Sequence, residues 1–157
     1  MRDHIDIDTR NCKEAMITMK KKRFYFCPIC GNLIEMVHDS GNVPYCCGKV
    51  MQELEAGVTD GKEEFHVPVC LKDGNRVAIK IGDQPHPMEE KHYIEWIEAV
   101  TNRRVIRKYL CQGCEPIMRF KLEDGEELCK AYAYCNLHKL WMCNCKTSEA
   151  CHTKSDT

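Results

Sequence analysis

The sequence has no excess of charge of either sign. Its 157 residues include 23 lysines and arginines against 24 aspartates and glutamates, a formal net charge of -1. Proteins that bind nucleic acids are usually clearly basic, so this balance argues against a nucleic-acid partner. The one basic run, Lys20 to Arg23, is short and is interpreted as a solvated stretch.

Long apolar segments are also missing. No stretch approaches the roughly 20 apolar residues that a membrane span requires, and residues 1–10 lack the apolar core of a secretory signal. We therefore expect a cytoplasmic protein without membrane association. In that reducing compartment the 13 cysteines are expected to remain thiols, so they indicate metal or redox chemistry rather than a disulfide framework.

The composition changes along the chain and predicts four parts. Residues 1–22 are an N-terminal extension, in which Asn11 can cap one helix. Residues 23–58 are dense in cysteine, glycine and proline and are too few to fold by packing alone, so a bound metal is expected to stabilise them. Residues 59–142 carry short strand patterns. Residues 143–157 are a polar tail that again contains cysteine.

The third part predicts a mostly β fold. Val77, Ile79 and Ile81 recur at the period of a strand, and turn signals such as Asp73-Gly74-Asn75 interrupt the pattern at short intervals. No amphipathic helix of core length is present. Further strands are expected at residues 65–70, 93–100, 105–110, 118–122 and 131–135. Short strands with such regular breaks predict an antiparallel sandwich or barrel.

A four-cysteine metal site is the strongest local signal. Cys27 and Cys30 enclose two residues, and Gly31 permits the positive φ that such a tight turn needs. Cys46 and Cys47 are adjacent, so both can reach one metal only if they lie in a turn. A vicinal disulfide or spare thiols are the alternatives. Four thiolates suit zinc and iron equally, so the site is either structural or an electron carrier.

A second group combines histidines with a cysteine. Each histidine alone is more often an ordinary surface or core residue. His86, however, is held between two prolines, and Cys135 and His138 repeat the spacing of the first cysteine pair. The candidate ligands of this second site are His66, His86, His92, Cys135 and His138.

From about Phe24 to Met142 the chain resembles desulfoferrodoxins, the two-domain superoxide reductases. The resemblance rests on the cysteine pattern above, on Glu64 with His66, on the string from His86 to Trp96, and on Tyr134 to His138. It implies a small desulforedoxin-like iron domain, followed by a neelaredoxin-like, immunoglobulin-like antiparallel β-sandwich. It also implies a homodimer and an electron donor such as rubredoxin.

The resemblance assigns roles to the second site. Four histidines, His66, His86, His92 and His138, would surround an iron, with the Cys135 thiolate on the axis and a sixth position open to superoxide. Glu64 would enter that position on the oxidised iron; the alternative is a solvated acid. The family usually has a lysine where this chain has Phe65, so weaker steering of superoxide is expected unless Lys62 or Lys91 replaces it.

Eight cysteines remain outside both sites: Cys12, Cys70, Cys111, Cys114, Cys129, Cys143, Cys145 and Cys151. Spare thiols, a thiol switch and a third metal site are the alternatives for them. The function expected overall is reduction of superoxide to hydrogen peroxide, with the four-cysteine iron as an electron relay or store. The rivals are an electron-transfer protein without a substrate and a redox-responsive regulatory module, for which no DNA-binding pattern is found.

Overall fold

The computed structural model describes residues 21–145. The chain divides into two compact units, Met1–Glu53 and Leu54–Thr157. The division lies slightly before the boundary expected after residue 58. The expected helix at the N-terminus and most of the expected tail lie outside the described residues.

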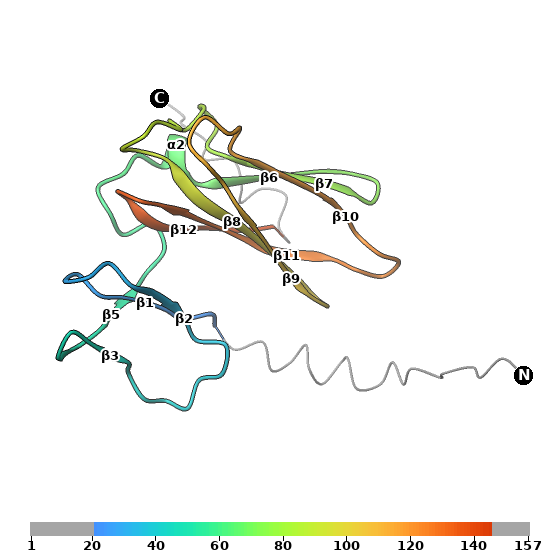
Figure 1. The fold of residues 1–157 in the computed structure, drawn as a ribbon. Helices are drawn as coiled ribbons and strands as arrows, with labels where there is room; N and C mark the ends of the chain where they lie inside the picture. The colour runs from blue at the N-terminus through green and yellow to red at the C-terminus, as the bar shows by residue number, and fades with distance from the viewer. Residues whose placement is uncertain (1–20, 146–157) are drawn as a thin grey trace, which may run out of the picture. The chain divides into compact units, whose positions relative to one another are not determined.

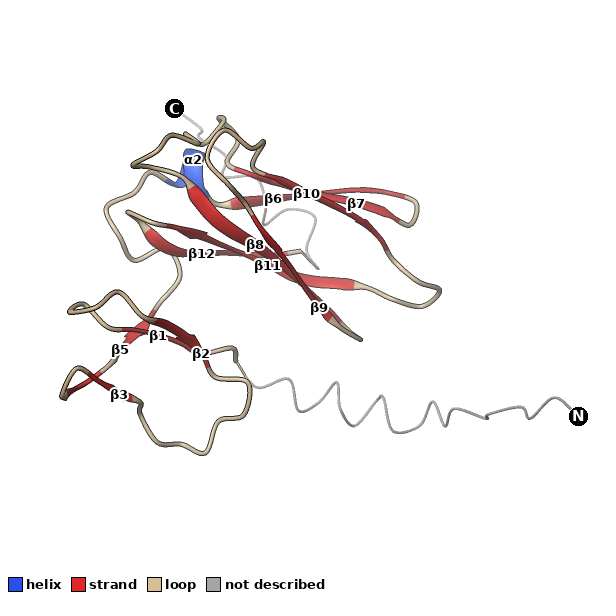
Figure 2. Ribbon diagram, viewed as in Figure 1, coloured by secondary structure: helices blue, strands red, loops and turns tan. Residues whose placement is uncertain are grey.

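Strands dominate the described part of the chain, as the sequence predicts (Figure 2). In chain order the elements are β1 (Phe24–Phe26), β2 (Leu33–Glu35), β3 (Tyr45–Cys46), β4 (Lys49–Val50), β5 (Gln52–Leu54), α2 (Glu63–His66), β6 (Pro68–Asp73), β7 (Arg76–Ile81), β8 (Ile94–Thr101), β9 (Val105–Tyr109), β10 (Ile117–Lys121), β11 (Leu128–Cys135) and β12 (Lys139–Asn144).

The first unit is built on a sheet with the strand order β2-β1-β5 and on the short antiparallel hairpin β3–β4. Its buried apolar cluster consists of Tyr25, Cys27 and Met51. So small a core gives little stabilisation from burial, which supports the expectation that this unit depends on a bound metal.

The second unit is a sandwich of two antiparallel sheets, with the strand orders β10-β7-β6 and β12-β11-β8-β9 (Figure 1). One apolar cluster takes buried side chains from both sheets: Ile79 and Ile81 of β7, Met118 of β10, Ile97 of β8 and Ala133 of β11 are among its members. The predicted fold class, mostly β with an immunoglobulin-like antiparallel sandwich, is confirmed.

The structure differs from the predicted strands at two places. Residues 63–66 form one helical turn, and the strand expected from Phe65 begins only at Pro68. The last strand, β12, is not predicted. Its buried residues Leu140, Trp141 and Cys143 do not alternate regularly with exposed ones, so the sequence shows no clear strand period there.

Antiparallel pairing brings four connections to one end of the sandwich. Trp96 at the start of β8 pairs with Tyr109 at the end of β9, and Ile117 at the start of β10 pairs with Lys80 at the end of β7. The turn between β11 and β12 and the helical turn α2 lie at the same end (Figure 1). Within residues 21–145, no helix is long and apolar enough to cross a membrane.

Candidate metal centres

The four predicted cysteines of the first unit come together. Cys27 and Cys30 follow β1, where Gly31 adopts φ 81°, as predicted. Cys46 ends β3, and Cys47 adopts φ 50° in the turn before β4. The left-handed conformation of Cys47 is the turn that the adjacent pair requires, because it lets both side chains face one point.

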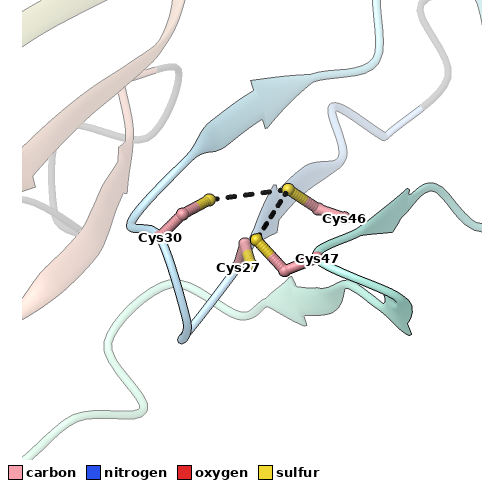
Figure 3. A group of neighbouring side chains, drawn as sticks. All are labelled: Cys27, Cys30, Cys46 and Cys47. Carbon is pink, nitrogen blue, oxygen red and sulfur yellow. Dashed lines mark hydrogen bonds between the residues drawn. The ribbon is translucent and has the colours of Figure 1, made fainter.

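The four sulfur atoms are spaced for one ion (Figure 3). All lie within 4.8 Å of one another; Cys30 Sγ is 3.5 Å from Cys46 Sγ, which is 4.0 Å from Cys47 Sγ. Metal–sulfur bonds of about 2.3 Å in a tetrahedron separate sulfurs by about 3.8 Å. The group therefore fits a tetrahedral thiolate site.

Hydrogen bonds prepare these sulfurs for a cation. The backbone N–H groups of Cys30 and Ile29 donate to Cys27 and lower the pKa of its thiol to about 7. The neighbouring sulfurs of Cys30 and Cys46 raise the pKa of Cys47 to about 12. Once one thiol is deprotonated, its negative charge disfavours deprotonation of the neighbouring thiols. A cation bound between the sulfurs offsets that repulsion.

The predicted second site lies at the end of the sandwich where the connections meet. His66 comes from α2, His86 and His92 from the loop between β7 and β8, and Cys135 and His138 from the end of β11 and the turn that follows. Ligand atoms of His66, His86, His92 and Cys135 lie within 4.8 Å of one another. His138 Nδ1 completes the group at 3.0 Å from His66 Nε2 and 3.7 Å from Cys135 Sγ.

The four imidazole rings form a square. Ring centroids of neighbours are 4.6 Å apart for His66–His86, 4.7 Å for His86–His92, 5.1 Å for His92–His138 and 4.7 Å for His138–His66. Neighbouring rings are close to perpendicular, at 70–80°, and the His66–His92 diagonal is longer, at 6.2 Å. Metal–nitrogen bonds of about 2.1 Å at right angles separate nitrogens by about 3.0 Å, as between His66 and His138.

Backbone contacts fix which ring nitrogen is available. His66 Nδ1 lies 2.7 Å from the Lys62 carbonyl, and His86 Nδ1 lies 2.6 Å from the Pro87 carbonyl. Each Nδ1 therefore carries the proton and leaves Nε2 as a ligand. The Nε2 atoms of His86 and His92 are buried and have no hydrogen-bond partner. Buried polar atoms without partners are rare, so these two fit an ion held between them.

Burial favours the neutral form of His66, His86 and His92. It is the main cause that lowers the pKa of His66 and His92, and it lowers the pKa of His86 to about 4. A neutral imidazole is the form that binds a metal. The residues thus offer unprotonated nitrogens at neutral pH.

Cys135 lies next to the rings, with its Sγ 3.7 Å from His138 Nδ1, and has no exposed surface. Burial raises the pKa of its thiol, and the backbone N–H groups of His138 and Leu137 counter that shift. Those two donors would hold a thiolate that a cation stabilises.

Residues without a predicted role hold the turn after β11 in place. Asn136 links it to the histidine loop, since its amide accepts from Tyr93 N–H at 3.0 Å and donates to the Lys91 carbonyl at 3.0 Å. Trp141 donates from Nε1 to the His138 carbonyl at 3.0 Å and stacks on His66 at 4.7 Å. Trp141 lies on the unpredicted strand β12, so no sequence signal identified it.

A pocket of about 260 Å³ opens over the rings. Its lining consists of Asp60, Gly61, Lys62, Phe65, His66, Pro87, His92 and His138. Cys135 and His86 are not part of this lining, and the Cys135 thiol has no exposed surface. Lys62 reaches the pocket, whereas Glu64, exposed on α2, is not part of its lining.

The expectation that the remaining cysteines stay thiols is wrong for four of them. Cys70 is bonded to Cys145, and Cys111 to Cys114. Cys143 lies close to the first of these pairs, and Cys129 carries a free thiol. Cys12 and Cys151 lie outside the described residues. The first pair joins β6 to the end of β12, and these strands belong to different sheets.

Comparison with known proteins gives one consistent relationship. The family model described as Desulfoferrodoxin matches residues 58–144. A desulfoferrodoxin homologue from Archaeoglobus fulgidus is 45% identical over 117 residues, covering 74% of this chain and 92% of the relative. A desulfoferrodoxin from Syntrophotalea carbinolica is 41% identical over 122 residues, covering 78% of this chain and 95% of the relative.

A solved structure supports the same relationship. The crystal structure of the superoxide reductase from Treponema pallidum matches with a TM-score of 0.65 and 29% sequence identity. The match covers 78% of this chain and 98% of that chain.

Proposed function

We propose that this chain, which belongs to the desulfoferrodoxin family, is a superoxide reductase that converts superoxide to hydrogen peroxide. The observation that carries this proposal is the square of four imidazoles, with a buried cysteine thiol next to it and a pocket lined by three of the histidines. Iron held by the four histidines and Cys135 would supply one electron to superoxide, which leaves as hydrogen peroxide after taking up two protons.

The ligand set leaves room for a substrate. Four imidazoles and one thiolate would hold the iron through five ligands, and the pocket lined by three of these histidines would give a small molecule access to it. Neutral imidazoles and a single thiolate leave a ferrous ion with net positive charge, which attracts a small anion. The Cys135 thiolate would donate electron density to a bound iron, as cysteine does in haem enzymes.

The test of this function is a measurement of stoichiometry. Superoxide pulses are added to the ferrous protein, and peroxide and dioxygen are measured. We expect one peroxide for each superoxide and no dioxygen, whereas dismutation yields one peroxide for every two and releases dioxygen. A protein that keeps its iron and yields no peroxide beyond spontaneous dismutation would instead be an electron carrier without a substrate.

Lys62 is our candidate for the positive charge that the family supplies at the position of Phe65. It lines the pocket, whereas Lys91 is exposed and contacts Asn136 through its backbone carbonyl. We expect Lys62→Ala to lower the rate with superoxide about threefold or more at low ionic strength and to flatten its salt dependence. Stopped-flow rates at several salt concentrations measure both effects.

The matched control for that experiment is Lys91→Ala, which should keep the rate and the salt dependence of the parent protein. If Lys62→Ala also kept them, Lys62 would have no part in steering and the pocket would attract superoxide through the iron alone.

We also propose that Glu64 binds the oxidised iron through its carboxylate. Its support is its position in the sequence, two residues before His66 on the same helical turn. We expect Glu64→Ala to change the absorption spectrum of the oxidised protein, since a ligand is lost, and to leave the ferrous form unchanged. Glu63→Ala, on the same exposed turn, is the control, and equal spectra for both variants would exclude the role.

The four-cysteine site is proposed to hold a second iron that relays or stores electrons. Its closed tetrahedron leaves no position for a substrate. Metal analysis separates the alternatives, because two irons per chain support the relay and one iron with one zinc makes the site structural.

The remaining proposals concern the setting of the protein. We infer a cytoplasmic location, because the thiolate ligands require reducing conditions to load. The resemblance to desulfoferrodoxins further suggests an electron donor such as rubredoxin and a homodimer. Reduction of the ferric protein by rubredoxin and sedimentation equilibrium test these two expectations.

A further inference from the structure

A cysteine pair lies beside the histidine site, on the loop that joins β9 to β10. Cys111 and Cys114 are bonded to each other and enclose two residues, with Gly113 at φ 75° in the turn between them. Cys111 is exposed and Cys114 is half-buried, so an external thiol can reach the bond. In reducing compartments, disulfides are mostly catalytic or redox-sensing, and exposed pairs at this spacing exchange readily.

The loop contacts the segment that carries two of the histidines. Gly113 N–H donates to the Met88 carbonyl at 2.7 Å, and the Gln112 side-chain amide donates to the Glu90 carbonyl at 3.2 Å. Both acceptors lie between His86 and His92. These histidines occupy neighbouring corners of the square, 4.7 Å apart. Both hydrogen-bond donors lie inside the ring that the disulfide closes.

We infer that Cys111 and Cys114 form a reversible dithiol–disulfide site that reacts with external dithiols and tunes the metal centre through the 86–92 loop. This inference rests on the proposed function only in taking the four histidines and Cys135 as an iron site. No part of the family resemblance requires a cysteine at either position.

The exchange is balanced with a dithiol as the reductant. A donor thiolate attacks Cys111 Sγ, the Cys111–Cys114 bond breaks, and Cys114 leaves as a thiolate that takes up a proton. The second thiol of the donor then attacks the mixed disulfide and releases Cys111. Two electrons and two protons pass to the pair, and the donor leaves as a disulfide. An external disulfide reverses the reaction.

Reducing the disulfide removes a conformational constraint on residues 111–114. The middle two of these residues donate the hydrogen bonds to the loop of residues 86–92. With the bond closed, Gln112 and Gly113 are fixed where they meet the Glu90 and Met88 carbonyls. With the bond open, the loop gains conformations in which those contacts are lost, so His86 and His92 are held less firmly. The geometry of the ligands influences the ferrous-to-ferric ratio of a bound iron. That ratio should therefore differ between the disulfide and the dithiol form of Cys111 and Cys114.

The experiment uses the iron-loaded full-length protein and has two readouts, neither of which involves superoxide. The protein is treated anaerobically with dithiothreitol and freed of reagent. Maleimide mass-tagging with peptide mapping then reports which cysteines are reduced. Spectroelectrochemical titration of the thiolate-to-iron absorption band next gives the ferrous-to-ferric ratio. We expect Cys111 and Cys114 to become labelled and the ratio at a fixed applied potential to change about fivefold or more.

The variant that isolates this pair is Cys111→Ser with Cys114→Ser, which should titrate like the reduced parent protein with or without dithiothreitol. Cys129→Ser is the matched control, since Cys129 already carries a free thiol, and it should respond as the parent does. A pair that stays oxidised in excess dithiothreitol, or identical iron titrations in both states, would overturn the inference. A failed peroxide assay beside a responsive titration would sink the proposed function alone.

Discussion

Replacing Cys135 with serine is expected to lower peroxide formation from superoxide at least about a hundredfold, because loss of even an outer partner of a metal ligand costs about 10- to 100-fold. A serine hydroxyl stays protonated where a thiol becomes a thiolate, so the negative charge beside the histidines disappears. The backbone N–H groups of Leu137 and His138, which point at this sulfur, would also lose their anionic acceptor. Stopped-flow rates and the thiolate-to-iron absorption band measure the loss.

Cys129→Ser is the control for that experiment as well. Cys129 is a half-buried thiol on β11, the strand that ends at Cys135, and it contacts the Glu127 carbonyl rather than a histidine. It should keep the rate and the absorption band. If Cys135→Ser kept them too, the axial role of the cysteine would be wrong, and the four histidines alone would account for the chemistry.

Replacing Gly82 with alanine is expected to lower the free energy of unfolding of the sandwich by about 2 to 5 kcal/mol. Gly82 adopts φ 79°, and a Cβ there would lie 2.5 Å from the Gln84 carbonyl oxygen and 2.7 Å from the backbone of Phe65. Those neighbours are backbone atoms and cannot rotate away. Chemical denaturation followed by tryptophan fluorescence reports on this unit, because both tryptophans, Trp96 and Trp141, lie in it.

Gly74→Ala provides the comparison. Gly74 also has a positive φ, 58°, but a Cβ there would meet nothing within 4 Å. Only the backbone cost, about 1 to 2 kcal/mol, is expected. Gly82→Ala should in addition lower iron occupancy, since the new Cβ would press on the backbone of Phe65, next to His66. Equal losses of stability in the two variants would show that the close approach at Gly82 has no energetic weight.

The strands were predictable where one face of the strand is buried. In β7, Val77, Ile79 and Ile81 are buried and alternate with more exposed residues, which is the period the sequence displays. The failures lie beside the histidine site. The apolar residues Phe65 and Val67 suggested a strand, yet one helical turn forms there, in which the Lys62 carbonyl meets His66 Nδ1. That contact forms only when the backbone makes a helical turn, and the alternation of apolar residues in the sequence does not indicate such a turn.

The cysteines also fall into a group whose arrangement was predictable from the sequence and a group whose arrangement was not. The spacing of Cys27, Cys30, Cys46 and Cys47 indicated a common site, and the positive φ of Gly31 and Cys47 is the geometry expected for it. The pairing of Cys70 with Cys145 was not predictable, because 75 positions separate them and only the packing of β6 near the end of β12 brings them together.

By itself, the sequence determined the four-cysteine group and the β character of the second unit, since short-range spacing and alternation encode both. The ligand roles of the histidine group came from the resemblance to desulfoferrodoxins. The tertiary structure decided the distances between the histidine rings, the pocket over them, and the contact between the Cys111–Cys114 loop and the histidine loop. These features depend on antiparallel pairing that joins residues distant in the chain. Such pairing sets positions in space, which the spacing of residues along a sequence does not specify.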